Sequence, residues 1–199
     1  SLTELGRLAE ALKVVATEGA APDLQLRGTD AMHSLGKVVL ARIVASERGG
    51  LGAKIRLDDV GSLLALPGVG AHGDALARHT SPSLTDAPLK SLLSAVSTAQ
   101  AADAPAFARE AAQAALLLVA QPHTSPVEAA HAVRTIAASG VLLDHAAAAL
   151  GRRAQAMETN DLATAIVALG DKSCEGHDLR AACQELATRK QNLERLPAA

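Results

Sequence analysis

Two cysteines and seven histidines are the residues best suited to metal or nucleophilic chemistry in this chain of 199 residues. Cys174 and His177 lie three positions apart, and Cys183 follows nine residues after Cys174. Structural zinc needs four such ligands in tetrahedral geometry, and only tertiary packing could bring His145 to this group as the fourth. A thiol beside an apolar helix is more often a small buried side chain. We therefore predict neither a metal site nor another cofactor.

Other catalytic patterns are also missing from the sequence. Asp144 and His145 are neighbours only in sequence, and no Gly-x-Ser-x-Gly nucleophile turn occurs. The Gly-rich stretch 49–54 follows a predicted helix rather than a strand, which is typical of a linker and not of a phosphate-binding loop. We predict that the protein is not an enzyme and has no small-molecule substrate. The alternative is an enzyme that assembles scattered His and Asp side chains inside a helical bundle. The histidines, which never form His-Glu-x-x-His, are at positions 33, 72, 79, 123, 131, 145 and 177.

A Gly-rich turn over residues 66–70 has the form of a helix-hairpin-helix turn. Backbone N–H groups of such a turn approach a phosphate at the start of the following helix. In this turn of Pro67, Gly68 and Gly70, the two glycines would make that approach with their N–H groups. Asp74 stands where a basic or small residue would help, so an ordinary loop between helices is the competing interpretation.

A second candidate surface is a set of basic residues in the last third of the chain. Arginine suits phosphate, because its planar guanidinium donates two parallel hydrogen bonds. Acidic residues such as Glu128 and Asp178 are interleaved, so a mixed solvated face is the alternative. The predicted contacts to RNA or to a partner are Arg134, Arg152, Arg153, Arg180, Arg189 and Lys190.

The composition favours an all-α protein with a core of small and aliphatic side chains. Hydrophobic residues make up 49% of the chain and charged residues 20%, and Phe107 is the one aromatic residue. Alanine and leucine form helices readily, whereas strands prefer aromatic and β-branched residues. A net charge of -2 offers no basic domain for nucleic acid. No apolar run reaches the ~20 residues that span a bilayer, so we expect no membrane span.

Hydrophobic periodicity predicts about 9–10 helices in two regions. Residues 1–80 form an N-terminal helical region with helices over 2–18 and 29–47, the second capped by Thr29 or Asp30. An irregular Gly/Pro-rich segment covers 48–83, with a loop at Ser81-Pro82-Ser83.

Residues 84–199 read as three helical hairpins, over about 85–121, 125–156 and 159–195. Thr85 or Asp86 would cap the first, with Pro88 in its first turn. Ser125 would cap the second, with Pro126 at its first position, and Gly140 would end its first helix.

These hairpins repeat at a nearly constant distance along the chain. Residues 127–136 align with residues 160–169 at a shift of 33, and the first hairpin aligns with the second at a shift of 40. Such periods indicate stacked antiparallel helical hairpins, as in an α-solenoid, in which neighbouring repeats bury each other's apolar faces. A single irregular helix bundle is the alternative, because Ala-rich helices align easily.

The stretch Asn160-Asp161-Leu162-Ala163-Thr164-Ala165-Ile166-Val167-Ala168-Leu169-Gly170 resembles the first helix of organellar helical repeats. These are the heptatricopeptide and octotricopeptide types that commonly precede RAP domains, and the resemblance covers about residues 82–195. It implies a mitochondrial or chloroplast location and a role in RNA processing or organellar ribosomes. Val167 stands where the family often has Trp, and the net charge is slightly acidic where RNA-binding members are basic.

We therefore expect a non-enzymatic scaffold or adaptor subunit of a larger assembly. The resemblance favours a mitochondrial ribonucleoprotein, either the mitoribosome or an RNA-processing complex. If the location is not mitochondrial, we expect an intracellular soluble protein. The expected partners are mainly other protein subunits, with RNA as a further contact. The alternative is a small nucleic-acid-binding domain that uses the turn at 66–70. The chain begins at Ser1 and not Met, which leaves open whether a leader peptide was removed.

Overall fold

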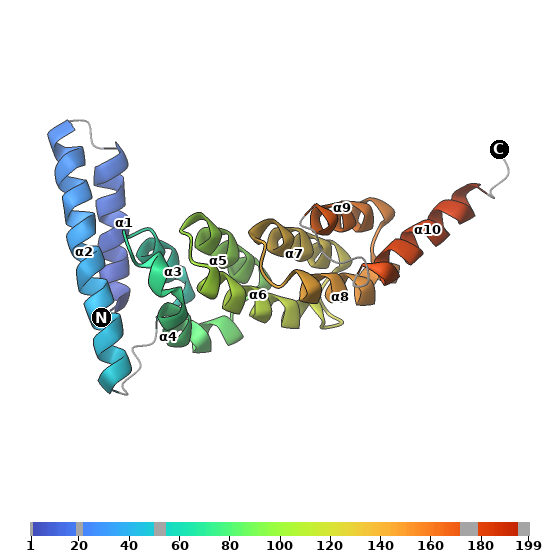
Figure 1. Ribbon diagram of the computed structural model, residues 1–199, viewed down its shortest axis with the longest axis horizontal. Coiled ribbons are helices and arrows are strands. Elements are labelled where there is room, and N and C mark those ends of the chain that lie inside the picture. Colours follow the sequence, from blue (N-terminus) through green and yellow to red (C-terminus); the bar gives the residue numbers. More distant parts are fainter. Residues whose placement is uncertain (1, 19–21, 50–54, 172–178, 195–199) are drawn as a thin grey trace. The chain divides into compact units, whose positions relative to one another are not determined.

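The computed structural model is all-α, which confirms the predicted fold class (Figure 1). It describes residues 2–18, 22–49, 55–171 and 179–194, and this part of the chain holds ten α-helices, two short 3-10 helices and no strand. Antiparallel helix pairs pack against one another, as stacked hairpins would. The elements are α1 (Leu2–Glu18), α2 (Pro22–Gly49), α3 (Leu57–Leu64), η1 (Gly70–His72), α4 (Gly73–Thr85), α5 (Leu89–Ala101), α6 (Pro105–Val119), α7 (Pro126–Ser139), α8 (Leu143–Arg153), η2 (Ala154–Ala156), α9 (Thr159–Gly170) and α10 (Arg180–Glu194).

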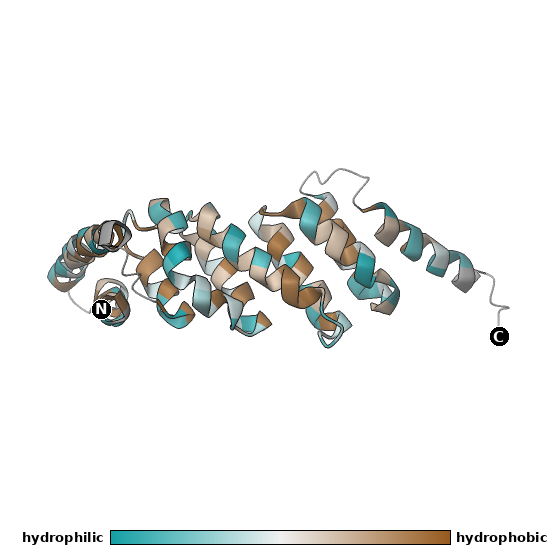
Figure 2. Ribbon diagram, turned by 90° about the horizontal axis from the view of Figure 1, so that it is seen from below, coloured by the Kyte–Doolittle hydropathy of each residue, from teal (hydrophilic) through white to brown (hydrophobic). Residues whose placement is uncertain are grey.

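The chain divides into two compact units, Ser1–Ala111 and Ala112–Ala199, with the boundary inside α6. The division predicted near residues 80–84 rests on the repeat pattern rather than on packing, and it stays a prediction. Figure 2 shows hydrophobic and hydrophilic residues side by side on the helices, as amphipathic helices require. None of the helices in the described ranges has both the length and the apolarity to span a bilayer.

In the first unit, α1 packs against α2 and α3, and α3 packs against α4 and α5. Glycine permits the contact between α1 and α3, since a Cβ at Gly6 would lie 3.2 Å from the Cβ of Asp59. Val60 and Leu63 of α3 and Leu92 of α5 are buried in the core of this unit. Aliphatic side chains therefore fill the space that aromatic residues occupy in many proteins.

The turn at residues 66–70 packs closely against α2 and against the turn after α5. Gly68 has a φ of +82°, a conformation that only glycine adopts easily. A Cβ at Gly36 of α2 would lie 2.7 Å from the carbonyl oxygen of Pro67. A Cβ at Gly70 would collide with the carbonyl oxygen of Ala102, and Gly70 is buried. Gly36 and Gly70 are therefore needed for close packing of the backbone.

In the second unit, α7 packs against α8 and α9, and α10 packs against α8, α9 and η2. The buried face of α7 is made of Ala129, Ala130, Ala132, Val133, Ile136 and Ala137. Small side chains of this kind let helices approach closely while still excluding water. The helix pairs α7–α8 and α9–α10 are the second and third hairpins that the sequence predicted.

The predicted ends of α7 are confirmed. The Ser125 hydroxyl accepts a hydrogen bond from the Glu128 backbone N–H at 3.2 Å, and the Glu128 carboxylate accepts one from the Ser125 N–H at 3.1 Å. This is a capping box, and Pro126 occupies the first turn as expected. Gly140 ends the helix in the left-handed conformation, with φ of 72°.

Three predicted helix boundaries are wrong. Helix α2 begins at Pro22, so Thr29 lies inside it and its hydroxyl donates to the Gln25 carbonyl at 2.9 Å instead of capping. Pro82 lies inside α4, where the loop was expected, because the buried Thr80 and Leu84 on either side hold the helix against the core. Pro88 precedes α5 as its N-cap rather than lying in its first turn.

We expect Gly70→Ala to reduce the free energy of unfolding of the first unit by about 1–3 kcal/mol, because the backbone must shift to admit the methyl group. Urea unfolding followed by circular dichroism measures this. Gly170→Ala is the control, since a Cβ there meets nothing within 4 Å, and a change within about 0.5 kcal/mol is expected. Equal effects of the two substitutions would contradict this account of the turn.

The capping box also predicts that the pKa of the Glu128 carboxyl group is lower than that of an ordinary glutamate. The hydrogen bond from the Ser125 hydroxyl, and then that from its backbone N–H, lower the pKa of Glu128. A lowered pKa adds stability that is present above the ordinary glutamate pKa of about 4.3 and is lost as the pH falls through the lowered value. An NMR titration should find this pKa below the ordinary value. Ser125→Ala should raise it again, and an unchanged pKa in that variant would disprove the assignment.

Candidate functional site

The six basic residues predicted as contacts do not form one uniform surface. Arg152, Arg180 and Lys190 are exposed, whereas Arg134, Arg153 and Arg189 are half-buried. Arg153 and Arg189 donate hydrogen bonds to backbone carbonyls of their own unit. The chemistry that suits arginine to phosphate is therefore used inside the fold at these two positions.

Arg153, the last residue of α8, bonds to the turn that precedes α7. Its guanidinium donates to the carbonyl of Thr124, and the Thr124 hydroxyl donates in turn to the Leu118 carbonyl at 2.7 Å. The Nε of Arg153 is buried and has no hydrogen-bond partner. This side chain thus ties the end of α8 to the end of α6 through a buried threonine.

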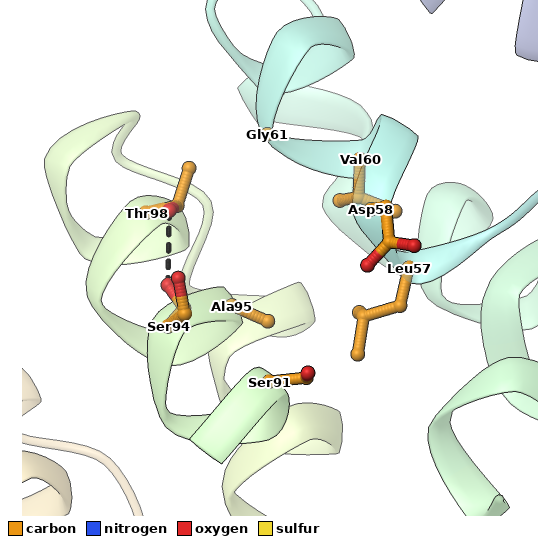
Figure 3. A pocket seen from close by; sticks show the side chains of 8 residues that line it. All are labelled: Leu57, Asp58, Val60, Gly61, Ser91, Ser94, Ala95 and Thr98. Carbon is orange, nitrogen blue, oxygen red and sulfur yellow. Dashed lines mark hydrogen bonds between the residues drawn. The ribbon is translucent and has the colours of Figure 1, made fainter. Parts of the chain in front are cut away.

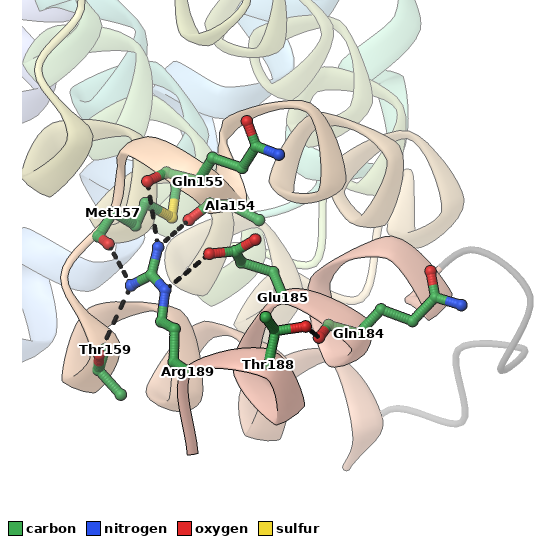
Figure 4. A network of polar contacts seen from close by, with 8 residues as sticks. All are labelled: Ala154, Gln155, Met157, Thr159, Gln184, Glu185, Thr188 and Arg189. Carbon is green, nitrogen blue, oxygen red and sulfur yellow. Dashed lines mark hydrogen bonds and ion pairs between the residues drawn. The ribbon is translucent and has the colours of Figure 1, made fainter. Parts of the chain in front are cut away.

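Arg189 on α10 makes the more extensive network, which is drawn in Figure 4. One terminal nitrogen donates to the Met157 carbonyl at 2.6 Å, and the other donates to those of Ala154 at 2.9 Å and Gln155 at 3.1 Å. Its Nε lies 2.8 Å from the carboxylate of Glu185. The acceptors lie at the end of α8 and η2, where helical carbonyls accept further hydrogen bonds and carry partial negative charge; that of Ala154 also accepts from the Met157 N–H at 3.3 Å. The guanidinium of Arg189 supplies both hydrogen-bond donors and a positive charge to these carbonyls.

The two arginines occupy equivalent places in successive hairpins. Thr124 directly precedes Ser125, the N-cap of α7, and Met157 directly precedes Glu158, the N-cap of α9. In each hairpin an arginine of the second helix therefore bonds to the carbonyl just before the first helix.

The predicted hairpin turn at 66–70 has a packing role. Pro67 and Gly68 are exposed, but Gly70 is buried against the turn after α5. In the first turn of α4, a carboxylate oxygen of Asp74 lies 3.4 Å from a terminal guanidinium nitrogen of Arg78. An acidic residue at this helix start repels a phosphate. Phosphate contact at the turn of Pro67, Gly68 and Gly70 stays a prediction.

A pocket that the sequence did not predict lies between α3 and α5 (Figure 3). Its volume is about 250 Å³, which is below the usual range of about 300–1,000 Å³ for small-molecule sites. The side chains of Asp58 and Ser91 point into the space between the two helices. The lining residues are Leu57, Asp58, Val60, Gly61, Ser91, Ser94, Ala95 and Thr98.

The pocket offers hydrogen bonds rather than catalysis. Asp58 is largely exposed and lies 3.4 Å from Arg56, and the Thr98 hydroxyl donates to the Ser94 carbonyl at 2.9 Å. Its lining has no histidine, cysteine or lysine to act as base or nucleophile. The sequence signal was the spacing of Ser91, Ser94 and Thr98, which places three hydroxyls on one face of a helix.

The predicted metal-type residues are only partly described. Cys174 and His177 lie outside the described residues, while Cys183 is an exposed free thiol and His145 is exposed on α8. Within the described ranges, no three His, Cys, Asp or Glu side chains lie close enough to hold a metal ion. His79 of α4 is buried, and its Nε2 has no hydrogen-bond partner.

The exposed apolar residues are concentrated in the first unit. Of the ten large hydrophobic side chains that are exposed in the described part of the chain, seven belong to α1 and α2. On α1, Leu8 and Val15 are 48% and 41% exposed, and with Ala11 they form one stripe. The others on this pair of helices, together called the α1–α2 apolar surface, are Val14, Leu24, Leu26, Val38 and Val44.

Comparisons with known proteins place the chain in no family, because no family model, curated protein or solved structure matches it. The organellar-repeat resemblance therefore rests on residues 160–170 of this chain alone.

Adjacent arginines of α8 provide a matched test of the internal role. We expect Arg153→Ala to lower the free energy of unfolding of the second unit by about 1.5–3 kcal/mol, because a charged hydrogen bond in the interior is lost. Arg152→Ala removes an exposed side chain and should change it by less than about 0.5 kcal/mol. Urea unfolding measures both. A neutral Arg153→Ala would mean that the Arg153 side chain is available for contact with RNA or a partner, as the sequence predicted.

Proposed function

We propose that this protein is a non-enzymatic helical scaffold subunit of a larger assembly, and that the α1–α2 apolar surface binds a helix of another protein subunit. The concentration of exposed apolar side chains on this pair of helices is the observation that carries the proposal. Contiguous exposed apolar residues on a folded protein mark an interaction surface. On α1, Leu8, Ala11 and Val15 form such a contiguous stripe. On α2, the exposed residues fall on two opposite sides of the helix, with Leu24 and Val38 on one side and Leu26 and Val44 on the other.

A helix is the occupant that fits this surface best. Two packed helices each bury one face, and a third helix laid beside them completes a small bundle. The stripe formed by Leu8, Ala11 and Val15 has the spacing at which one helix packs along another. A partner helix with its own apolar stripe would bury both surfaces in the helix-in-groove manner.

The assembly that the repeat resemblance implies is a mitochondrial ribonucleoprotein, and we include that location in the proposal. Contact with other proteins is the main way in which this chain would bind within the assembly, because the net charge is -2 and Arg153 and Arg189 are engaged with backbone carbonyls. The remaining basic residues supply a secondary contact to RNA. Binding to RNA as the main role would appear as a steep decrease in affinity with salt.

The experiment is affinity purification of the full chain followed by crosslinking through lysines. Lys13 on α1 and Lys37 on α2 report on the proposed surface, and Lys90 on α5 serves as a comparison within the same unit. The partner's crosslinks should map to Lys13 and Lys37. Crosslinks confined to Lys90 would contradict the proposed surface.

The matched variants are Leu8→Lys with Val15→Lys, and the control is Val127→Lys with Val167→Lys, which changes exposed valines of the second unit. The first pair places two charges in the buried interface and should weaken binding at least about tenfold, as 1.4 kcal/mol would. The control pair should have little effect. Circular dichroism must show both variants folded, and equal affinities would rule out the α1–α2 apolar surface.

A further inference from the structure

Over residues 180–191, α10 buries few apolar side chains, and Leu186 is half-buried. Among its residues 180–191, only Ala182 is buried, and Leu179 just before the helix is buried as well. By contrast, α9 of the same unit buries Leu162, Ala165 and Leu169. Burial of apolar area contributes most of the free energy that holds a helix in place. This contribution is smaller for α10 than for its neighbours.

Polar contacts supply much of the attachment of α10. Arg189 donates hydrogen bonds to three backbone carbonyls at the end of α8 and η2. Glu185, one turn earlier on α10, pairs with the same guanidinium, and the two side chains are only 23% and 19% exposed. One side chain of α10 therefore carries most of the described polar contact with α8 and η2.

A second contact brings α10 close to the backbone of α8. A Cβ at Gly151 of α8 would lie 3.3 Å from the Cβ of Ala181, which is tighter than an ordinary contact. Glycine at this position thus admits α10, and a large side chain there would push it away without altering Arg189.

We infer that α10 is a detachable helix that separates from α8 and α9 as one unit while α7, α8 and α9 stay folded, and that Arg189 determines how often it does so. Segments with few buried apolar contacts open at a lower free energy than the rest of a domain. Detachment uncovers the faces of α8 and α9 that α10 covers. This device belongs to the second unit and does not depend on the proposed scaffold function.

Hydrogen exchange on the full chain tests this inference. Amides of α10 should exchange at least about tenfold faster than those of α7 in the unmodified chain, because their opening costs less than unfolding the unit. Arg189→Ala should accelerate exchange in α10 by a further factor of about ten or more, the effect of losing a charged hydrogen bond, and leave α7 unchanged. Arg180→Ala, at an exposed arginine of the same helix, should change neither.

Gly151→Leu is the second variant, because it displaces α10 by its volume and keeps every hydrogen-bonding group. It should accelerate exchange in α10 as Arg189→Ala does, with α7 again unchanged. A single common exchange rate for α7 and α10 in the unmodified chain would overturn the inference. So would both variants accelerating α7 and α10 equally.

Discussion

Close approach between helices that carry small side chains is the constraint on which both units depend. With one aromatic residue in the chain, the core consists mostly of alanine, leucine and valine. Dispersion contacts fall off steeply with distance, so short side chains stabilise a core only if the backbones lie near each other. Gly6, Gly36 and Gly70 mark places where a single added methyl group would crowd a neighbouring element. The fold is therefore sensitive at these glycines as well as at its large buried side chains such as Phe107.

A core of small side chains makes the polar ends of the helices more important. Each alanine buries little area, so less hydrophobic free energy is available to offset an unsatisfied carbonyl or N–H group. The Ser125–Glu128 capping box, Arg153 and Arg189 each satisfy such groups at a junction between helices. Arg153 and Arg189 donate hydrogen bonds at equivalent junctions of two successive hairpins. The two hairpins therefore share these hydrogen bonds as well as the spacing of their apolar residues.

Local signals in the sequence predicted the all-α class and the ends of α7, because Ser125, Pro126 and Gly140 act through the backbone within a few residues. The start of α2 was missed, since Thr29 has two ways to satisfy its hydroxyl and only packing selects the one inside the helix. The roles of Arg153 and Arg189 depend on carbonyls about thirty residues earlier, and no local pattern encodes that distance. The α3–α5 pocket likewise exists only after the two helices have packed.

Two of the six basic contact residues predicted from the sequence are engaged inside the fold. Guanidinium binds phosphate and helical carbonyl ends for the same reason, which is a rigid array of donors with a positive charge. Sequence spacing cannot distinguish these two uses, and the carbonyls contacted by Arg153 and Arg189 favour the second at those positions. What remains on the second unit is a mixed surface with Arg152, Arg180 and Lys190 exposed among acidic residues. Apolar area on α1 and α2 is then a stronger basis for partner binding than charge, because desolvating apolar groups is favourable, whereas exposed ion pairs contribute little.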